Sequence, residues 1–147
     1  MWQPSTNQNN NETGHTKKTI LVVEDSPTQA VQIRALLVAN GLHVQLACDG
    51  VEGLEMATEI LPDLIILDME MPRMNGIEMA HALKDNPLTC KIPMIMFTRH
   101  DSPEVMAKGL GEGIVDFIPK DAFAKVVMVE TLKQMGIITR NTSSSGS

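Results

Sequence analysis

Short apolar runs alternate with longer amphipathic stretches along most of the chain, and this alternation is the strongest constraint on its fold. Most of the runs are continuous series of β-branched and aliphatic residues, as in strands that are buried on both faces of a sheet. The amphipathic stretches have the spacing of helices that cover such a sheet. Strands and helices that alternate in this way form a parallel sheet with helices on its faces. The sequence therefore predicts an α/β fold.

Five strands and five helices are expected from these patterns. The strands are predicted at residues 19–23, 43–47, 64–67, 92–97 and 114–118, and the helices at residues 27–40, 51–60, 77–84, from 102 onward, and 122–135. Ser26 and Ser102 each supply a helix cap followed by a first-turn proline. The end of the helix that opens at Ser102 is left open, because three closely spaced glycines weaken it.

The charge balance and the tails limit the classes of function. The chain has 12 basic and 18 acidic residues, a net charge of −6, and no basic block beyond Lys17-Lys18, which disfavours nucleic-acid binding. No apolar stretch approaches the roughly 18 residues of a membrane span, so we expect a cytoplasmic protein without membrane contact. Residues 1–18 are predicted as a disordered polar tail, 19–137 as the folded domain, and 138–147 as a flexible Ser/Gly tail.

Polar residues follow four of the predicted strands. Glu24 and Asp25 end the first strand, Asp68 the third and Thr98 the fourth, and Lys120 follows the fifth. Because ligands of an open parallel sheet bind beyond the carboxyl ends of its strands, we expect these side chains to converge. Taken singly, each has an ordinary structural interpretation, such as helix-end charge or solvated lysine. Their joint placement favours a functional site.

The residue types at this edge indicate phosphoryl chemistry. Three clustered carboxylates repel one another unless a cation compensates them, and hard oxygen ligands suit Mg²⁺. A lysine and a hydroxyl can then bind phosphate oxygens. No glycine-rich nucleotide loop follows any predicted strand, so a carboxylate is the candidate nucleophile.

Four segments resemble, in order and spacing, the motifs of bacterial response-regulator receiver domains. They are residues 20–26, 64–76, 95–98 and 116–120. The resemblance covers residues 19–136. It implies a doubly wound, flavodoxin-like fold with five parallel strands in the order 2-1-3-4-5, flanked by five helices.

The resemblance assigns roles to individual residues. Asp68 would be the phosphoacceptor, taking its phosphoryl group from a histidine kinase or a histidine phosphotransfer protein. Glu24 and Asp25 would hold Mg²⁺, or Mn²⁺ in its place, together with Asp68 and the backbone carbonyl of Glu70. Lys120 would pair with Asp68 and then with its phosphate.

A phosphorylation-dependent switch is also implied. Thr98 would bond a phosphoryl oxygen, and Phe117 stands where the family has its aromatic switch residue. The responding surface would be the helix opening at Ser102, the strand 114–118 and the helix 122–135. The resemblance does not identify the output partner. A second copy of the chain, bound through this surface in a homodimer, is one alternative. Beyond its own phosphorylation and dephosphorylation, no enzymatic activity is expected.

Four positions depart from the family pattern. Arg99 follows Thr98 where a small residue is usual, and His100 and Glu70 are also atypical. We hypothesise that Arg99 and Glu70 form an ion pair that partly covers Asp68 and slows both gain and loss of the phosphoryl group. Asp121 replaces the usual proline after the lysine, which leaves the cis or trans state of the preceding peptide bond open.

Two other functions compete with the switch. A haloacid-dehalogenase-type phosphatase also uses an aspartate nucleophile with Mg²⁺, but it would need a second aspartate where Glu70 stands. A phosphorylation-independent interaction module is the stronger alternative, because Arg99 could close the site.

Overall fold

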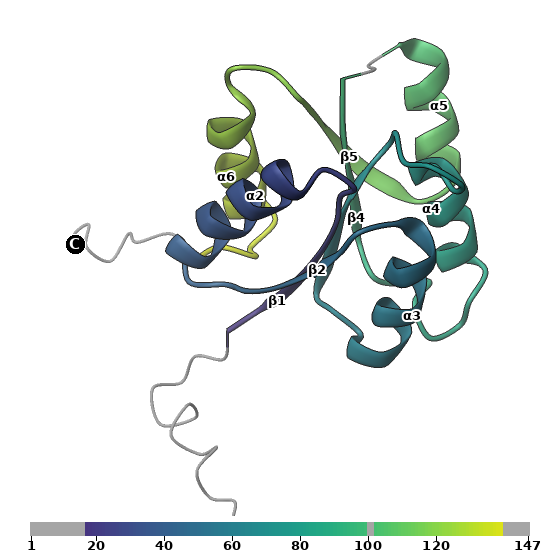
Figure 1. Cartoon of the computed structure of the whole chain (residues 1–147), viewed down its shortest axis with the longest axis horizontal. Coiled ribbons are helices and arrows are strands. Elements are labelled where there is room, and N and C mark those ends of the chain that lie inside the picture. Colours follow the sequence, from purple (N-terminus) through teal and green to yellow (C-terminus); the bar gives the residue numbers. More distant parts are fainter. Residues whose placement is uncertain (1–16, 100–101, 140–147) are drawn as a thin grey trace, which may run out of the picture.

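The structure is a computed structural model, and it describes residues 17–99 and 102–139 (Figure 1). Within these ranges, five strands alternate with five helices, as the sequence predicts. The strands are β1 (Thr19–Val23), β2 (His43–Ala47), β3 (Leu64–Asp68), β4 (Met94–Thr98) and β5 (Ile114–Pro119), and the helices are α2 (Pro27–Ala39), α3 (Gly50–Ile60), α4 (Gly76–Lys84), α5 (Pro103–Gly111) and α6 (Ala124–Gln134). His100 and most of the two predicted tails lie outside the described residues.

The strands form one parallel sheet in the order β2-β1-β3-β4-β5. This order confirms the predicted doubly wound fold. Helices α2 and α6 cover one face of the sheet, and α3, α4 and α5 cover the other (Figure 1). The connection after β1 runs through α2 on one face, and the connection after β3 runs through α4 on the other. The carboxyl ends of β1 and β3 therefore adjoin at the switch point of the sheet, where ligands bind in such folds.

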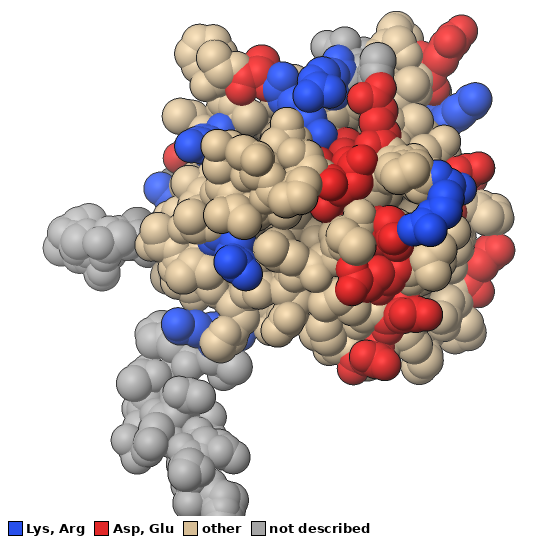
Figure 2. Space-filling model, in the orientation of Figure 1, with Lys and Arg blue, Asp and Glu red and all other residues tan. Residues whose placement is uncertain are grey.

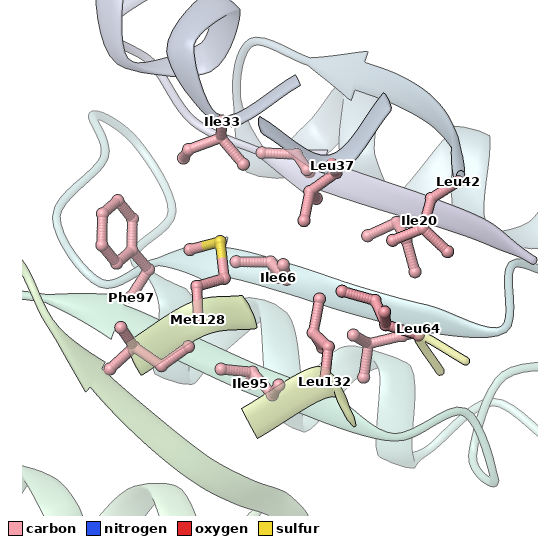
Figure 3. Close-up of a cluster of buried hydrophobic side chains, with 13 residues drawn as sticks. Ile20, Ile33, Leu37, Leu42, Leu64, Ile66, Ile95, Phe97, Met128 and Leu132 are labelled. Atoms are coloured by element: carbon pink, nitrogen blue, oxygen red, sulfur yellow. The ribbon is translucent and has the colours of Figure 1, made fainter. Parts of the chain in front are cut away.

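Alternate residues of the central strands serve two separate cores. Leu64 and Ile66 of β3 pack with α2 and α6 in the first core cluster (Figure 3), whereas Ile65 and Leu67 pack with α3 and α4 in the second. Every residue of β3 and β4 is buried, which explains why their sequences are continuously apolar. The residues at the ends of these strands are therefore held on a rigid base.

Most helix starts are fixed by side-chain caps. The hydroxyl of Ser26 accepts a hydrogen bond from the backbone of the first turn of α2, and Ser102 does the same for α5. Asn75 and Glu78 form a capping box at the start of α4. The two predicted serine caps are thereby confirmed.

Several boundaries differ from prediction by one or two residues. Strand β4 begins at Met94 rather than at residue 92, because the backbone of Ile92 is hydrogen-bonded in a turn to Thr89. Helix α6 begins at Ala124 rather than at residue 122, because the Asp121 carboxylate accepts a hydrogen bond from the Phe123 amide in a local turn. Ile138 is only 4% exposed and packs in the first core cluster, so the packed chain extends past residue 137.

The surface carries the acid surplus in a visible pattern. On the face seen in Figure 2, acidic side chains form a band, whereas basic side chains are scattered around it. Among the described residues, no helix is both long and apolar enough to cross a membrane.

Candidate functional site

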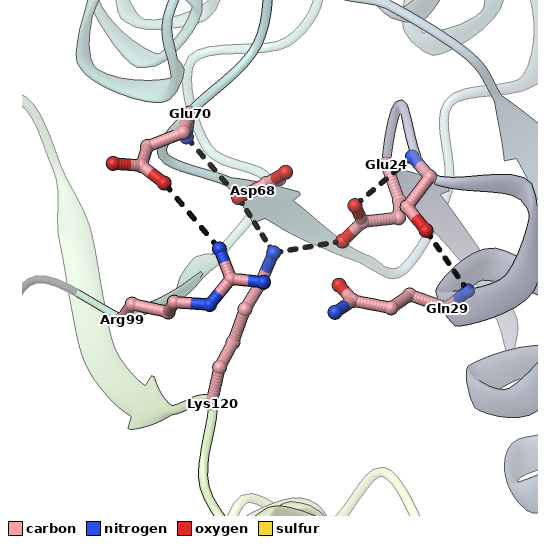
Figure 4. A network of polar contacts seen from close by, with 7 residues as sticks. Glu24, Gln29, Asp68, Glu70, Arg99 and Lys120 are labelled. Atoms are coloured by element: carbon pink, nitrogen blue, oxygen red, sulfur yellow. Dashed lines mark hydrogen bonds and ion pairs between the residues drawn. The ribbon is translucent and has the colours of Figure 1, made fainter.

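Glu24, Asp68 and Lys120 form the floor of a site at the carboxyl edge of the sheet. Lys120 follows β5, and its Nζ lies 2.9 Å from Asp68 Oδ1 and 3.2 Å from Glu24 Oε1 (Figure 4). The side chains are all buried: Lys120 is 8% exposed, Asp68 4% and Glu24 2%. The ammonium also lies 5.0 Å from the centre of the Phe97 ring. The predicted convergence of these residues is confirmed.

Asp25 adds a third carboxylate to the floor, at an exposed position. Glu24, Asp25 and Asp68 each offer an oxygen within 4.8 Å of the others. Burial, together with the charge of Asp68, raises the pKa of Glu24 to about 7. Desolvation and Asp68 also raise the pKa of Asp25. Lys120 contributes a single positive charge, so this donor set suits a divalent cation with hard oxygen ligands.

The backbone around Asp68 is held closely by the start of α4. A β-carbon at Gly76 would lie 2.6 Å from the carbonyl oxygen of Asp68, so only glycine permits this approach. The amide of Gly76 donates to the carbonyl of Met69 at 2.9 Å. The amide of Glu70 donates to Asp68 Oδ1 at 3.1 Å, which fixes the orientation of the carboxylate.

Thr98 and Phe117 lie on the same face of the sheet. Phe117 of β5 pairs with Met96 of β4, two residues before Thr98, and alternate residues of a strand point to one side. Thr98 is 1% exposed at the end of β4. Phe117 is half-buried against the second core cluster, which contains Met96. The two side chains are thus placed so that a movement of Thr98 could be accompanied by a movement of Phe117. Their role as a switch stays a prediction.

Arg99 and Glu70 meet at the rim of the site. Arg99 Nη1 lies 3.8 Å from Glu70 Oε1, and the two side chains are 60% and 47% exposed (Figure 4). The predicted ion pair is therefore present. His100, another position that departs from the family pattern, lies outside the described residues.

The family model described as "Response regulator receiver domain" matches residues 20–133. This chain belongs to the response regulator receiver domain family. The match includes the whole floor of the site, from Glu24 to Lys120, and it places this receiver domain in two-component signalling.

Curated relatives include response regulators and a hybrid kinase. The response regulator MprA of Mycobacterium sp. (strain KMS) is 36% identical over 124 residues, which are 84% of this chain and 51% of MprA. Hybrid signal transduction histidine kinase D of Dictyostelium discoideum is 37% identical over 125 residues, 82% of this chain but 8% of the kinase. The receiver domain thus spans about half of one relative and a small part of the other.

Solved structures with the same fold include a chemotaxis protein and the receiver domain of a histidine kinase. The chemotaxis protein CheY4 of Vibrio cholerae has a TM-score of 0.76 at 29% identity, covering 81% of this chain and 98% of CheY4. The signal receiver domain of a histidine kinase from Syntrophus aciditrophicus has a TM-score of 0.73 at 34% identity, covering 84% of this chain and 94% of that domain.

The loop after Lys120 departs from the family pattern in a defined way. No cis peptide bond occurs among the described residues, so the Lys120–Asp121 bond is trans. The sequence alone does not decide between cis and trans.

Beside the loop, a pocket of about 390 Å³ lies between α2 and α6. Its lining includes Gln29, Arg99, Lys120, Asp121 and Ala122.

Sequence reasoning did not single out Gln29. Its side-chain Oε1 is buried without a hydrogen-bond partner among the described residues, and Figure 4 shows the amide directed toward Lys120. Gln29 lies in the first turn of α2, three residues after the Ser26 cap, so helix geometry could have placed it near the strand ends. Nothing in its residue type pointed to the site.

Proposed function

We propose that this receiver domain is a phosphorylation-dependent switch in which Asp68 accepts a phosphoryl group. The observation that carries this proposal is the position of the Asp68 carboxylate, held 2.9 Å from a buried ammonium and beside two further carboxylates. Such a charged cluster at the switch point of the sheet is suited to phosphoryl transfer.

A phosphohistidine on a histidine kinase or phosphotransfer protein is the expected donor. A carboxylate oxygen of Asp68 attacks the phosphorus, the P–N bond breaks, and the imidazole nitrogen keeps its electron pair. The new phosphoryl group adds a charge of about −1.5 to −2. Lys120 neutralises part of this charge, and the buried hydroxyl of Thr98 donates to a phosphoryl oxygen.

Glu24, Asp25 and Asp68 would hold Mg²⁺, or Mn²⁺, together with the backbone carbonyl of Glu70. A bound divalent ion would offset the negative charge that accumulates on the carboxylate and phosphoryl oxygens. Burial, followed by the negative charge of Asp68, raises the pKa of Glu24, and a bound cation would oppose both effects. The receiver domain of the sensor histidine kinase PA1611 from Pseudomonas aeruginosa carries magnesium in its active site cleft, but at 24% identity this likeness supports only the shared fold.

The responding surface is formed by α5, β5 and α6. Each of these elements exposes an apolar side chain: Leu110 is 60% exposed, Val115 54% and Val126 66%. Coupling of Thr98 to Phe117 would alter this surface on phosphorylation. Its occupant is an output protein or a second copy of the chain, and sedimentation with and without beryllofluoride distinguishes the two.

Incubation with Mg²⁺ and a small acyl phosphate tests the proposal by intact-mass spectrometry. The expected result is one added phosphoryl group, lost in Asp68→Asn and kept in Asp85→Asn, an exposed aspartate at the end of α4. Turnover of a phosphate ester would instead support a phosphatase. Absence of both a covalent adduct and beryllofluoride binding would support a phosphorylation-independent interaction module.

A further inference from the structure

Gly109 of α5 faces the ring of Phe117. Gly109 is buried, and a β-carbon built at this position would lie 2.7 Å from Phe117 Cζ and 3.1 Å from Cε2. Real β-carbons do not approach other atoms as closely as the first of these distances. The aromatic ring therefore occupies the space that a side chain at position 109 would need.

The backbone does not require glycine at position 109. Its φ angle is outside the left-handed region, and it lies within a regular helix, where alanine is the more favourable residue. Gly111, at the end of the same helix, provides a contrast. A β-carbon there would meet no atom within 4 Å. Of these two glycines, only Gly109 is explained by the ring of Phe117.

The neighbours of α5 limit how the helix could yield to a larger residue. At its carboxyl end, Lys84 of α4 donates to the carbonyl of Gly111 at 3.0 Å. Just beyond, the His81 ring of α4 lies 2.9 Å from a Glu112 carboxylate oxygen. The helix is thus tied to α4, whereas the ring can rotate about its own side-chain bonds.

We propose that Gly109 is a positioning residue that forms a seat for Phe117. The rotamer of Phe117 and the distance of α5 from β5 are then set by the same contact and change together. Since Phe117 lies on the face of the sheet that carries Thr98, movement of the ring is communicated to α5. This last step rests on the proposed function, whereas the seat does not.

Four variants test the seat: Gly109→Ala, Gly111→Ala, Phe117→Leu, and Gly109→Ala combined with Phe117→Leu. Gly111→Ala should raise the melting temperature by about 2–6 °C, the gain expected from replacing a helical glycine. Gly109→Ala should lower it and shift the NMR signals of the Phe117 ring. In the Phe117→Leu background, Gly109→Ala should become stabilising, because leucine lacks the Cε and Cζ atoms that the new methyl group would meet.

Either of two results would overturn the seat. One is a Gly109→Ala variant that is as stable as Gly111→Ala with unmoved Phe117 signals. The other is an equal loss of stability in the presence and absence of the Phe117 ring, which would place the clash elsewhere.

The affinity for beryllofluoride with Mg²⁺ tests the link to the switch. Gly109→Ala should change this affinity at least threefold, and Gly111→Ala should leave it unchanged. A displaced ring with unchanged affinity would overturn the link. If the wild type binds no beryllofluoride, the proposed function fails, while the stability and NMR results still decide the seat.

Discussion

The floor and the rim of the site each pair a cation with a carboxylate, but in different surroundings. On the floor, Lys120 and Asp68 are 2.9 Å apart and less than a tenth exposed. At the rim, Arg99 and Glu70 are 3.8 Å apart and about half exposed. Water and salt screen the rim pair, whereas the floor pair lies where charges interact strongly and are costly to leave unpaired.

This difference separates formation of the site from its tuning. Glu24, Asp68 and Lys120 each lie at or directly after the end of a strand, so their geometry follows from the sheet. The rim residues lie on loops, and their side chains are about half exposed to water. Substitutions on the floor should therefore change stability and phosphorylation together, and substitutions at the rim should change rates alone.

Lys120→Met should produce the largest effect, because it leaves two buried carboxylates without their cation. Removal of one partner of a buried pair typically lowers the free energy of unfolding by about 3–5 kcal/mol. The loss should be greatest near pH 8 without Mg²⁺ and smaller at pH 5, where Glu24, with a pKa of about 7, is protonated. Urea unfolding measures this difference.

The matched control for that change is Lys125→Met, which alters an exposed lysine of α6 beside the same pocket. It should leave stability within about 0.5 kcal/mol of the wild type. Similar losses in both lysine variants would mean that burial does not distinguish the floor from its surroundings.

Glu24→Gln should stabilise the protein above pH 7 in the absence of divalent ions. The folded state binds the Glu24 proton more tightly than the unfolded state, since the pKa is raised from 4.5 to about 7. This group therefore lowers stability progressively as pH rises between these values. Melting curves at pH 5 and pH 8 should show the gain only at pH 8.

Mg²⁺ should reverse the order of stability at pH 8, so that the wild type becomes more stable than Glu24→Gln. The wild type gains stability by binding the ion, whereas Glu24→Gln has lost a carboxylate of the cluster. Glu55→Gln, on the exposed face of α3, is the control and should follow the wild type under both conditions. If Glu24→Gln is no more stable than the wild type at pH 8 without Mg²⁺, the floor is not short of positive charge.

The strand order and the floor of the site could be predicted because both follow from buried strands. Continuous apolar runs such as residues 64–67 locate the sheet, and the polar residue after each run then lies at its edge. Asp68 and Lys120 are 52 residues apart in sequence and still meet for this reason.

The remaining features depend on packing that has no local signature. The seat of Phe117 exists because Gly109 has no β-carbon. The sequence showed only that several glycines weaken this helix, and it did not show which of them faces the ring. Gln29 has an ordinary residue type for an amphipathic helix, and its buried amide oxygen becomes notable only in three dimensions. Strand β4 begins two residues later than predicted, because the amide of Ile92 donates to the carbonyl of Thr89 in a turn.

Arg99→Ala tests the rim with a smaller expected effect. Exposed ion pairs are worth about 0–1 kcal/mol, so the lifetime of the phosphoryl group should shorten by at most about fivefold. Phosphorylation by a small acyl phosphate should become faster to a similar extent, while the melting temperature stays unchanged. Glu70→Gln should reproduce both changes. An unaltered lifetime in Arg99→Ala would show that the rim pair does not cover Asp68.

Substitution of His81 should have the smallest effect on stability. This residue lies in an exposed cluster of charged side chains between α4 and α5. Its ring nitrogens lie 2.9 Å from a Glu112 oxygen and 3.4 Å from an Asp85 oxygen. The hydrogen bond and charge of Glu112, followed by Asp85, raise the pKa of His81. The protonated ring therefore stabilises the fold fully below the ordinary histidine pKa, and this contribution is lost as pH rises through the raised value.

His81→Gln should therefore slightly lower the melting temperature near pH 6 and leave it unchanged near pH 8. Salt at about 1 M should weaken the difference at pH 6, because exposed charges are screened. His43→Gln, at an exposed position of β2, serves as the matched control for the loss of an exposed histidine. A loss in His81→Gln as large as that in Lys120→Met would contradict the comparison, because an exposed pair would then match a buried one.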